Sequence, residues 1–399
     1  MLNIAIKMLW GDRTKFFGLL FGISFTAFLV TFALSFFAGF MTNSFALISE
    51  NPTADVWVMD PAVQSTEMTI NMPESVLSQV KSIDGVNYAT ALAIGDISVR
   101  FPNGRFQTFQ MIGVDDATLT GAPKPPFGDV ETLLHIPDAV IVASGGTEGK
   151  LQTPIYKRDQ WAYDGAHLSV PMRSLKAGDE LLINDKRVFV AGVSKTIPRF
   201  PPRPLIYTTF STFKKILPSE SRYITFVLVS AKPGVSPKKL AQRISTITGF
   251  SARTSDDFKK DTIKWYLINS EDVGDMSAML ILAMTVGFGF TGIMLYMFTY
   301  ENLQQYAVLK AIGTSDKTLL SMIFAQASVT AFIGAGIGIG VCALVGELIV
   351  GFEINYPFRL MWFAPLVGVV GVMIISLTAA LISMRPVLQL DPVRVFSGK

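Results

Sequence analysis

The chain has 399 residues, of which 50% are hydrophobic and 16% charged, and its mean hydropathy is +0.42. This composition places it among membrane proteins. A net charge of +3, without a basic run interleaved with aromatic residues, argues against a nucleic-acid partner. One cysteine, Cys342, and two histidines, His135 and His167, exclude a disulfide framework and argue against a metal site.

The first predicted element, residues 1–15, is an amphipathic helix that leads into a membrane span. Lys7, Arg13 and Lys15 precede an apolar run that far exceeds the roughly 7–15 apolar residues of a signal peptide. We therefore expect this run to be a membrane anchor.

Four stretches carry no ionisable side chain and exceed the roughly 20 residues that a membrane-spanning helix needs. They are predicted as transmembrane helices at residues 16–49, 276–300, 318–346 and 360–384. The expected fold is a polytopic α-helical membrane protein with four transmembrane helices. A large α+β extracytoplasmic domain, residues 50–275, is inserted between the first and the second.

Lysine and arginine residues near the span ends predict the orientation, because cytoplasmic flanks are enriched in them. Such residues flank the spans before 16, between 300 and 318, and after 384, whereas the connection 347–359 holds only Arg359. Both termini, residues 301–317 and the tail 385–399 are therefore predicted to be cytoplasmic. The connection 347–359 is then predicted to be an external loop.

Residues 50–275 have the alternation and turn residues of a folded α+β domain. Residues 53–61 predict a strand, and a helix is predicted to begin at Pro73 and to end near Gly85. Hairpins are predicted at Asn103-Gly104 and Asn184-Asp185. A further strand and helix end near Gly249, so two βαβ-like lobes are expected.

Two parts of this domain have weaker patterns. Residues 123–175 show little periodicity and predict an inserted subdomain or long loops. Residues 198–207 are proline-rich with two arginines and predict a rigid surface connection, with a cargo or partner contact as the alternative.

The spans contain small residues at helix-packing spacing and no ionisable residue, so transport driven by an ion gradient is not expected. Gly334 pairs with Gly338, and Gly336 with Gly340, on two faces of one predicted helix. Packing within one four-helix unit accounts for one face. A homodimer contact is the other interpretation that these pairs allow.

Catalysis is not predicted for this chain. The sequence has no phosphate-binding loop, no nucleophile elbow and no H-E-x-x-H motif. The carboxylate pairs at 115–116 and 256–257 are interpreted as solvated turn residues. The chain is therefore not expected to be an enzyme or to bind a cofactor itself.

The segment "YENLQQYAVLKAIGTSDKTL" resembles the signature of the FtsX-like ABC permease family. The matching residues, in order, are Glu301, Ala307, Val308, Lys310, Ala311, Ile312, Gly313 and Thr314. Asn302 stands where the family usually has arginine, and Gln305 where it has a second acid. The segments "AIKMLWGDRTKFFGLLFGI", "LKAGDELLINDKRVFVAGV" and "RPVLQLDPVRVF" are similar to other parts of these permeases, including the MacB-type and DevC-type exporters.

This resemblance implies a type VII ABC transporter permease that works as a dimer with two copies of a separate ATPase, which binds ATP and Mg²⁺. The implied activity is movement of the extracytoplasmic domain by mechanotransmission, for export of a drug, glycolipid, haem or toxin-like cargo. A periplasmic adaptor, an outer-membrane channel and membrane lipid are implied partners, and the implied location is the bacterial inner membrane. Two alternatives are an FtsX-like signalling scaffold that controls a cell-wall hydrolase and a lipoprotein-releasing permease. The size of the domain disfavours the scaffold.

The segment 301–317 is the predicted coupling helix. On a helix, Glu301, Gln305, Val308 and Ile312 share one sector, opposite Leu303, Tyr306 and Lys310. We expect a helix continuous with the second span that ends at Gly313 in left-handed geometry. The residues predicted to couple to the ATPase are Glu301, Gln305, Val308, Leu309, Lys310, Ile312 and Gly313.

Overall fold

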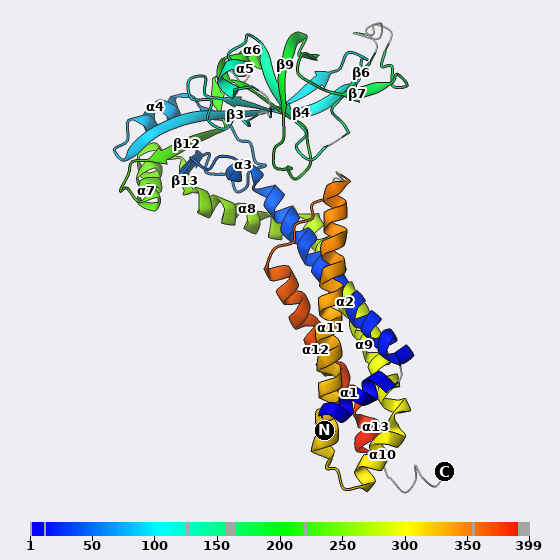
Figure 1. The fold of residues 1–399 in the computed structure, drawn as a ribbon. Helices are drawn as coiled ribbons and strands as arrows, with labels where there is room; N and C mark the ends of the chain where they lie inside the picture. Colours follow the sequence, from blue (N-terminus) through cyan, green and yellow to red (C-terminus); the bar gives the residue numbers. More distant parts are fainter. Residues whose placement is uncertain are drawn as a thin grey trace. The chain divides into compact units, whose positions relative to one another are not determined.

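The computed structural model describes residues 2–11, 13–124, 126, 128–147, 149–155, 161, 165–218, 222–352 and 356–389. The chain divides into two compact units. A helical unit comprises Met1–Gly39 and Glu271–Lys399, and an inserted domain comprises Phe40–Ser270. Figure 1 shows the elements of both units along the chain.

The helical unit is built from long apolar helices joined by short ones. Its helices are α1 (Leu2–Gly11), α2 (Arg13–Ser44), α9 (Glu271–Glu301), α10 (Leu303–Ala311), α11 (Asp316–Gly351), α12 (Phe363–Ser383) and α13 (Arg385–Leu388). Among the described residues, four helical segments are long and apolar enough to cross a membrane: α2, α9, α11, and α12 with α13. The chain is therefore a polytopic α-helical membrane protein.

The helices begin and end at other residues than the predicted spans. The helix α2 ends at Ser44, before the short helix α3 (Ala46–Ser49), and α11 continues through Glu347 to Gly351. The limits of the predicted spans were set where charged residues stop and begin again in the sequence. Helix ends follow backbone hydrogen bonding instead, which continues through polar residues.

Glycines let α2 and α9 pack closely in this unit. A Cβ at Gly22 of α2 would overlap the ring of Phe290, and a Cβ at Gly287 of α9 would overlap Thr26. Small residues at such contacts allow two helices to approach, as is common in membrane proteins.

The inserted domain is built on one mixed sheet. Its nine strands are β1 (Val56–Met59), β3 (Val86–Arg100), β4 (Phe106–Val114), β5 (Ala139–Ala143), β8 (Glu180–Ile183), β9 (Lys186–Ser194), β10 (Leu205–Thr209), β12 (Phe226–Ala231) and β13 (Ser251–Thr254). Their order is β13-β1-β12-β3-β4-β10-β5-β9-β8, and β8 pairs again with β3. The strands from β3 to β8 therefore close into a barrel-like lobe.

The other lobe is a layer of four strands with helices on both faces. On one face, the helices α4 (Ser75–Lys81) and α7 (Pro237–Thr248) pack on the strands. Leu240 of α7 lies in one buried cluster with Val56 of β1 and Val227 of β12. On the opposite face, Trp57 and Phe226 pack against Phe258 of α8 (Ser255–Asn269). Alternate strand residues thus face two different layers.

Smaller elements complete the domain. They are α5 (Val130–Leu134), α6 (Phe210–Ile216), the pair β2 (Met72–Pro73) with β11 (Tyr223–Ile224), and the pair β6 (Gln152–Pro154) with β7 (Met172–Ser174).

The two predicted βαβ units exist, but the prediction that each forms its own lobe is wrong. β12 lies between β1 and β3, and β1 lies between β12 and β13, so the two units interleave in one lobe. Residues 123–175 were predicted as an inserted subdomain or long loops, and neither describes β5, because it pairs with both β10 and β9 in the main sheet. β6 and β7 in the same range form a separate two-stranded pair.

Both predicted hairpins are confirmed. Asn103-Gly104 lies in the turn between β3 and β4, and Gly104 has a φ of 81°. Asn184 and Asp185, between β8 and β9, have φ values of 46° and 59°. Two successive positive φ angles are those of a type I′ turn, which suits the twist of the paired strands.

Candidate functional site

The predicted coupling segment forms the separate helix α10, so the expected continuity with α9 is wrong. The side-chain amide of Asn302 donates to the carbonyl oxygen of Phe298 at 2.7 Å. The backbone N–H of Asn302 donates to the same oxygen at 3.3 Å. Asparagine side chains compete with helical backbone bonds in this way, and α10 starts anew at Leu303.

One side of α10 is bound to the rest of the helical unit. The buried Tyr306 hydroxyl donates to Oε1 of Gln326 in α11 at 3.0 Å. Lys310 forms an ion pair with Asp316 at 3.0 Å and donates to the carbonyl oxygen of Leu388 at 3.3 Å. The half-buried Leu309 packs on the same apolar cluster as Tyr306. These contacts hold α10 against α11 and α13.

The other side of α10 is exposed. Val308 is 42% and Ile312 is 76% exposed, and Gln305 in the same helical sector is also exposed. Glu301 ends α9 and forms an ion pair with Lys15 of α2. The predicted residues therefore divide into an exposed face of Gln305, Val308 and Ile312, and the anchoring residues Glu301, Leu309 and Lys310.

Gly313 has the predicted left-handed conformation, with a φ of 97°. Its N–H donates to the Lys310 carbonyl at 3.0 Å, and the N–H of Thr314 donates to the Leu309 carbonyl at 3.1 Å. This pair of bonds is the Schellman motif, which ends a helix sharply.

The glycines of α11 face two environments. A Cβ at Gly334 would overlap Ile23, and one at Gly338 would overlap the carbonyl oxygen of Ser24. A Cβ at Gly336 or Gly340 would meet no described atom within 4 Å. Packing against α2 therefore accounts for the first pair, whereas the second pair has no such contact in the described chain.

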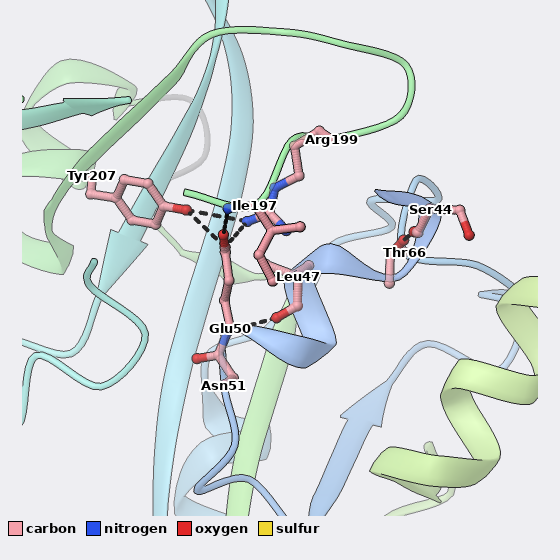
Figure 2. Close-up of polar contacts among 8 residues, drawn as sticks. All are labelled: Ser44, Leu47, Glu50, Asn51, Thr66, Ile197, Arg199 and Tyr207. Carbon is pink, nitrogen blue, oxygen red and sulfur yellow. Dashed lines mark hydrogen bonds and ion pairs between the residues drawn. The ribbon is translucent and has the colours of Figure 1, made fainter. Parts of the chain in front are cut away.

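A buried polar cluster in the inserted domain was not predicted (Figure 2). Glu50 Oε2 accepts from Arg199 Nη2 at 2.5 Å and from the Tyr207 hydroxyl at 3.3 Å. Its Oε1 accepts from the backbone N–H of Ile197 at 2.7 Å. Arg199 is 4% and Tyr207 1% exposed. Burial raises the pKa of the Tyr207 phenol, so the hydroxyl remains protonated and donates to Glu50.

The interpretation of residues 198–207 as a surface connection is therefore wrong at Arg199, which is an interior residue. The same segment carries a second pair, between Arg203 Nη2 and Glu67 Oε2 at 2.6 Å. Desolvation raises the pKa of Glu67, against the opposing charge of Arg203. The two arginines were visible in the sequence, but Glu50 lies 149 positions from Arg199, and no local pattern joins them.

The described part of the chain shows no cluster of side chains suited to binding a metal ion. Within the described ranges, no group of three or more His, Cys, Asp or Glu side chains is placed to hold a metal ion. The two candidate sites of this structure are thus the exposed face of α10 and the Glu50 cluster.

Comparison with protein families matches nearly all of the chain. The model of the MacB-like periplasmic core domain matches residues 16–247. The model of the FtsX-like permease C-terminal region matches residues 277–392. The second match includes α10 and both glycine pairs.

Individual relatives are similar at low identity. An uncharacterised ABC transporter permease of Methanocaldococcus jannaschii is 23% identical over 240 residues, 57% of this chain and 59% of that protein. HrtB of Staphylococcus epidermidis, which carries the provisional name of a hemin transport system permease, is 25% identical over 39% of this chain and 43% of its own. The chain thus spans about half the length of these curated relatives.

A solved structure with similarity to this chain is the periplasmic region of MacB from Actinobacillus actinomycetemcomitans. It has 13% sequence identity and a TM-score of 0.35, and the match covers 56% of this chain and 96% of that chain.

Proposed function

Because the chain belongs to the FtsX-like and MacB-like family of ABC transporter permeases, we propose that it couples a separate ATPase to movement of its inserted domain. In this proposal two copies of the chain assemble with two ATPase subunits, which bind ATP and Mg²⁺. The proposed activity of the complex is export of an amphiphilic or hydrophobic molecule.

The observation that carries the proposal is the two-sided environment of α10. Tyr306 and Lys310 are held by α11 and α13, whereas Val308 and Ile312 are exposed. A partner that grips the exposed side therefore displaces the bundle through the anchored side. Two exposed branched apolar residues beside Gln305 suit the apolar centre and polar rim of a protein interface.

The orientation follows from the same assignment. An ATPase that uses cytoplasmic ATP requires α10 on the cytoplasmic side, which agrees with Lys310 and Lys317 beside it and with Lys7 and Lys15 before the first span. The inserted domain then lies outside, in the periplasm where an adaptor and outer-membrane channel would complete the path.

The open glycine pair of α11, Gly336 and Gly340, is the proposed contact between two copies of the chain. Glycines four residues apart allow two membrane helices to approach closely. The pair faces no described part of its own chain, so a second copy can use it without disturbing the bundle.

Cargo is assigned only as a chemical class. The name of the staphylococcal relative points to hemin, which is a planar amphiphilic molecule. The described spans α2, α9, α11 and α12 carry no Asp, Glu, Lys, Arg or His between residues 16 and 44, 276 and 300, 318 and 346, or 363 and 383, so a polar path for a hydrophilic solute is not part of the proposal.

The proposal is tested by Val308→Asp in the full chain, co-expressed with its ATPase. A charge buried without a partner at an interface is costly, so co-purification of the ATPase, or the coupling of its hydrolysis to transport, should be lost. Val308→Ile should retain both. Ile247→Asp, which places aspartate at a 61% exposed apolar position of α7, is the matched control. A coupled complex with Val308→Asp would refute the role of α10.

A further inference from the structure

Two chain segments connect the inserted domain to the helical unit, and both contact the segment Ile197–Tyr207. The first connection leaves through the end of α2, α3 and Glu50, and the second returns through α8 to Ser270. All contacts described below lie within the inserted domain, Phe40–Ser270.

The first connection is bound to this segment at two points. Glu50 accepts hydrogen bonds from Ile197, Arg199 and Tyr207, as Figure 2 shows. Ten residues earlier, the fully buried ring of Phe40 packs edge-on against Phe200, with ring centroids 4.2 Å apart. An apolar contact thus holds the last turns of α2, and polar contacts hold Glu50, which directly follows α3.

The second connection is bound to the same segment. The hydroxyl of Tyr266, in the last turns of α8, donates to the carbonyl oxygen of Phe200 at 3.0 Å. The Tyr266 ring also lies edge-on to Phe40, at 5.6 Å between centroids. Phe200 therefore contacts both connections at once.

The charges make the first attachment hard to release. Arg199 is 4% exposed, and its Nε and Nη1 atoms form no hydrogen bond with the described residues. Its guanidinium therefore depends on Nη2, which pairs with Glu50 and donates to Tyr207 at 3.2 Å. A buried cation without its partner strongly destabilises the protein. Moving Glu50 away from Arg199 therefore costs free energy, and the ion pair holds Glu50 in place.

Tyr207 connects Glu50 to the main sheet. It lies in β10, which pairs with β4 on one side and β5 on the other. A displacement of Glu50 is therefore passed to the middle of the barrel-like lobe, instead of being absorbed by the turn between Ser49 and Val56.

We infer that Ile197–Tyr207 is a clamp that makes both membrane connections move with the barrel-like lobe. Glu50, Arg199 and Tyr207 are the positioning residues for the first connection, and Phe200 holds the second through Tyr266. The clamp is a property of the inserted domain alone. Its role in transmitting movement rests on the proposed function.

The clamp is tested by distance measurements between spin labels in the full chain with its ATPase, in lipid nanodiscs and on a Cys342→Ser background. Labels at Asn43, in the last turn of α2, and Asp185, in the β8–β9 turn, report the clamp. Labels at Ser82 and Asp185 report the shape of the domain itself. The variants are Glu50→Gln, Tyr207→Phe and the reversed pair Glu50→Arg with Arg199→Glu.

Glu50→Gln should broaden the Asn43–Asp185 distances and leave the Ser82–Asp185 distances unchanged. In the unmodified chain the Asn43–Asp185 distance should stay constant on addition of ATP, because the clamp makes both positions move together. In Glu50→Gln this distance should become ATP-dependent while ATP hydrolysis continues, and the reversed pair should restore the narrow, constant distance. Asp179→Asn is the matched control, because the Arg173–Asp179 pair, at 2.5 Å and with a 12% exposed carboxylate, touches neither connection. It should leave the Asn43–Asp185 distances unaltered.

An unchanged Asn43–Asp185 distribution in Glu50→Gln would overturn the clamp. If Glu50→Gln also alters the Ser82–Asp185 distances, Tyr207→Phe decides, because it removes a single hydroxyl; no broadening there would equally overturn the clamp. An Asn43–Asp185 distance that changes with ATP in the unmodified chain as much as in Glu50→Gln would overturn the transmitting role. If the Asn43–Asp185 distance is independent of ATP in every variant, Glu50→Gln included, the connection does not move and the proposed function is refuted, while the nucleotide-free distances still decide the clamp.

Discussion

The hydroxyl of Tyr306 donates a hydrogen bond to Oε1 of Gln326 across 3.0 Å, in the buried interior of the helical unit. Tyr306 belongs to α10 and Gln326 to α11, so this bond joins the candidate coupling helix to a span. Buried side-chain hydrogen bonds of this kind fix one geometry, because leaving either partner unsatisfied is costly.

Tyr306→Phe should therefore loosen α10 without removing its apolar contacts. A lost buried hydrogen bond costs about 1 kcal/mol, so the thermal unfolding midpoint of the purified chain should fall by a few degrees. ATP-driven transport should fall more than binding of the ATPase, because the exposed face of α10 is unchanged. Tyr300→Phe, at a 57% exposed tyrosine of α9, is the control. Equal effects of the two substitutions would show that the Gln326 bond is unimportant.

The two glycine pairs of α11 should respond differently to leucine. Gly338→Leu must displace the backbone of α2 near Ser24, so we expect misfolding of the single chain and low yield from membranes. Gly336→Leu has open space and should leave the chain folded. If Gly336 and Gly340 form the contact between copies, Gly336→Leu should give monomers in cross-linking and size-exclusion experiments. Intact dimers with leucine at both positions would place the contact elsewhere.

Local features of this fold could be predicted from the sequence, because their causes lie within a few residues. The hairpin at Asn184-Asp185 needs only residues that tolerate positive φ, and the ends of α7 at Gly249 and α10 at Gly313 need only glycine in left-handed geometry. The four apolar helices follow from uninterrupted hydrophobic runs.

Features that depend on distant partners could not be predicted. The spacing of Gly334 and Gly338 showed a packing face, but not that α2 occupies it. The pairing of β5 with β9 and β10 has no local signature in a segment with little periodicity. Arg199 looked like a surface residue, because arginine is almost never fully buried unless it is paired, and its partner lies far away in the sequence.

The Glu50–Arg199 pair should show strong energetic coupling in a double-mutant cycle. Removing one partner of a buried ion pair costs about 3–5 kcal/mol, whereas replacing both with apolar residues is often nearly neutral. Because the Glu50 side chain is 16% exposed, the cost of Glu50→Leu should lie toward the lower end of this range. Unfolding of the inserted domain, followed by tryptophan fluorescence in urea, should show Glu50→Leu with Arg199→Met to be more stable than either single variant. Additive losses would mean that the two side chains act independently.

The orientation of the chain should be visible in cysteine labelling on a Cys342→Ser background. Ile312 is 76% exposed at the end of α10, and Asp185 is exposed in the β8–β9 turn, so a cysteine at either position is accessible from its own side. The ATPase proposal requires Ile312→Cys to face the cytoplasm, where the flanking lysines also place it. A membrane-impermeant maleimide applied to intact spheroplasts should therefore label Asp185→Cys and spare Ile312→Cys. Permeabilised membranes should label both. Labelling of Ile312→Cys in intact cells would invert the topology, and no cytoplasmic ATPase could then bind α10.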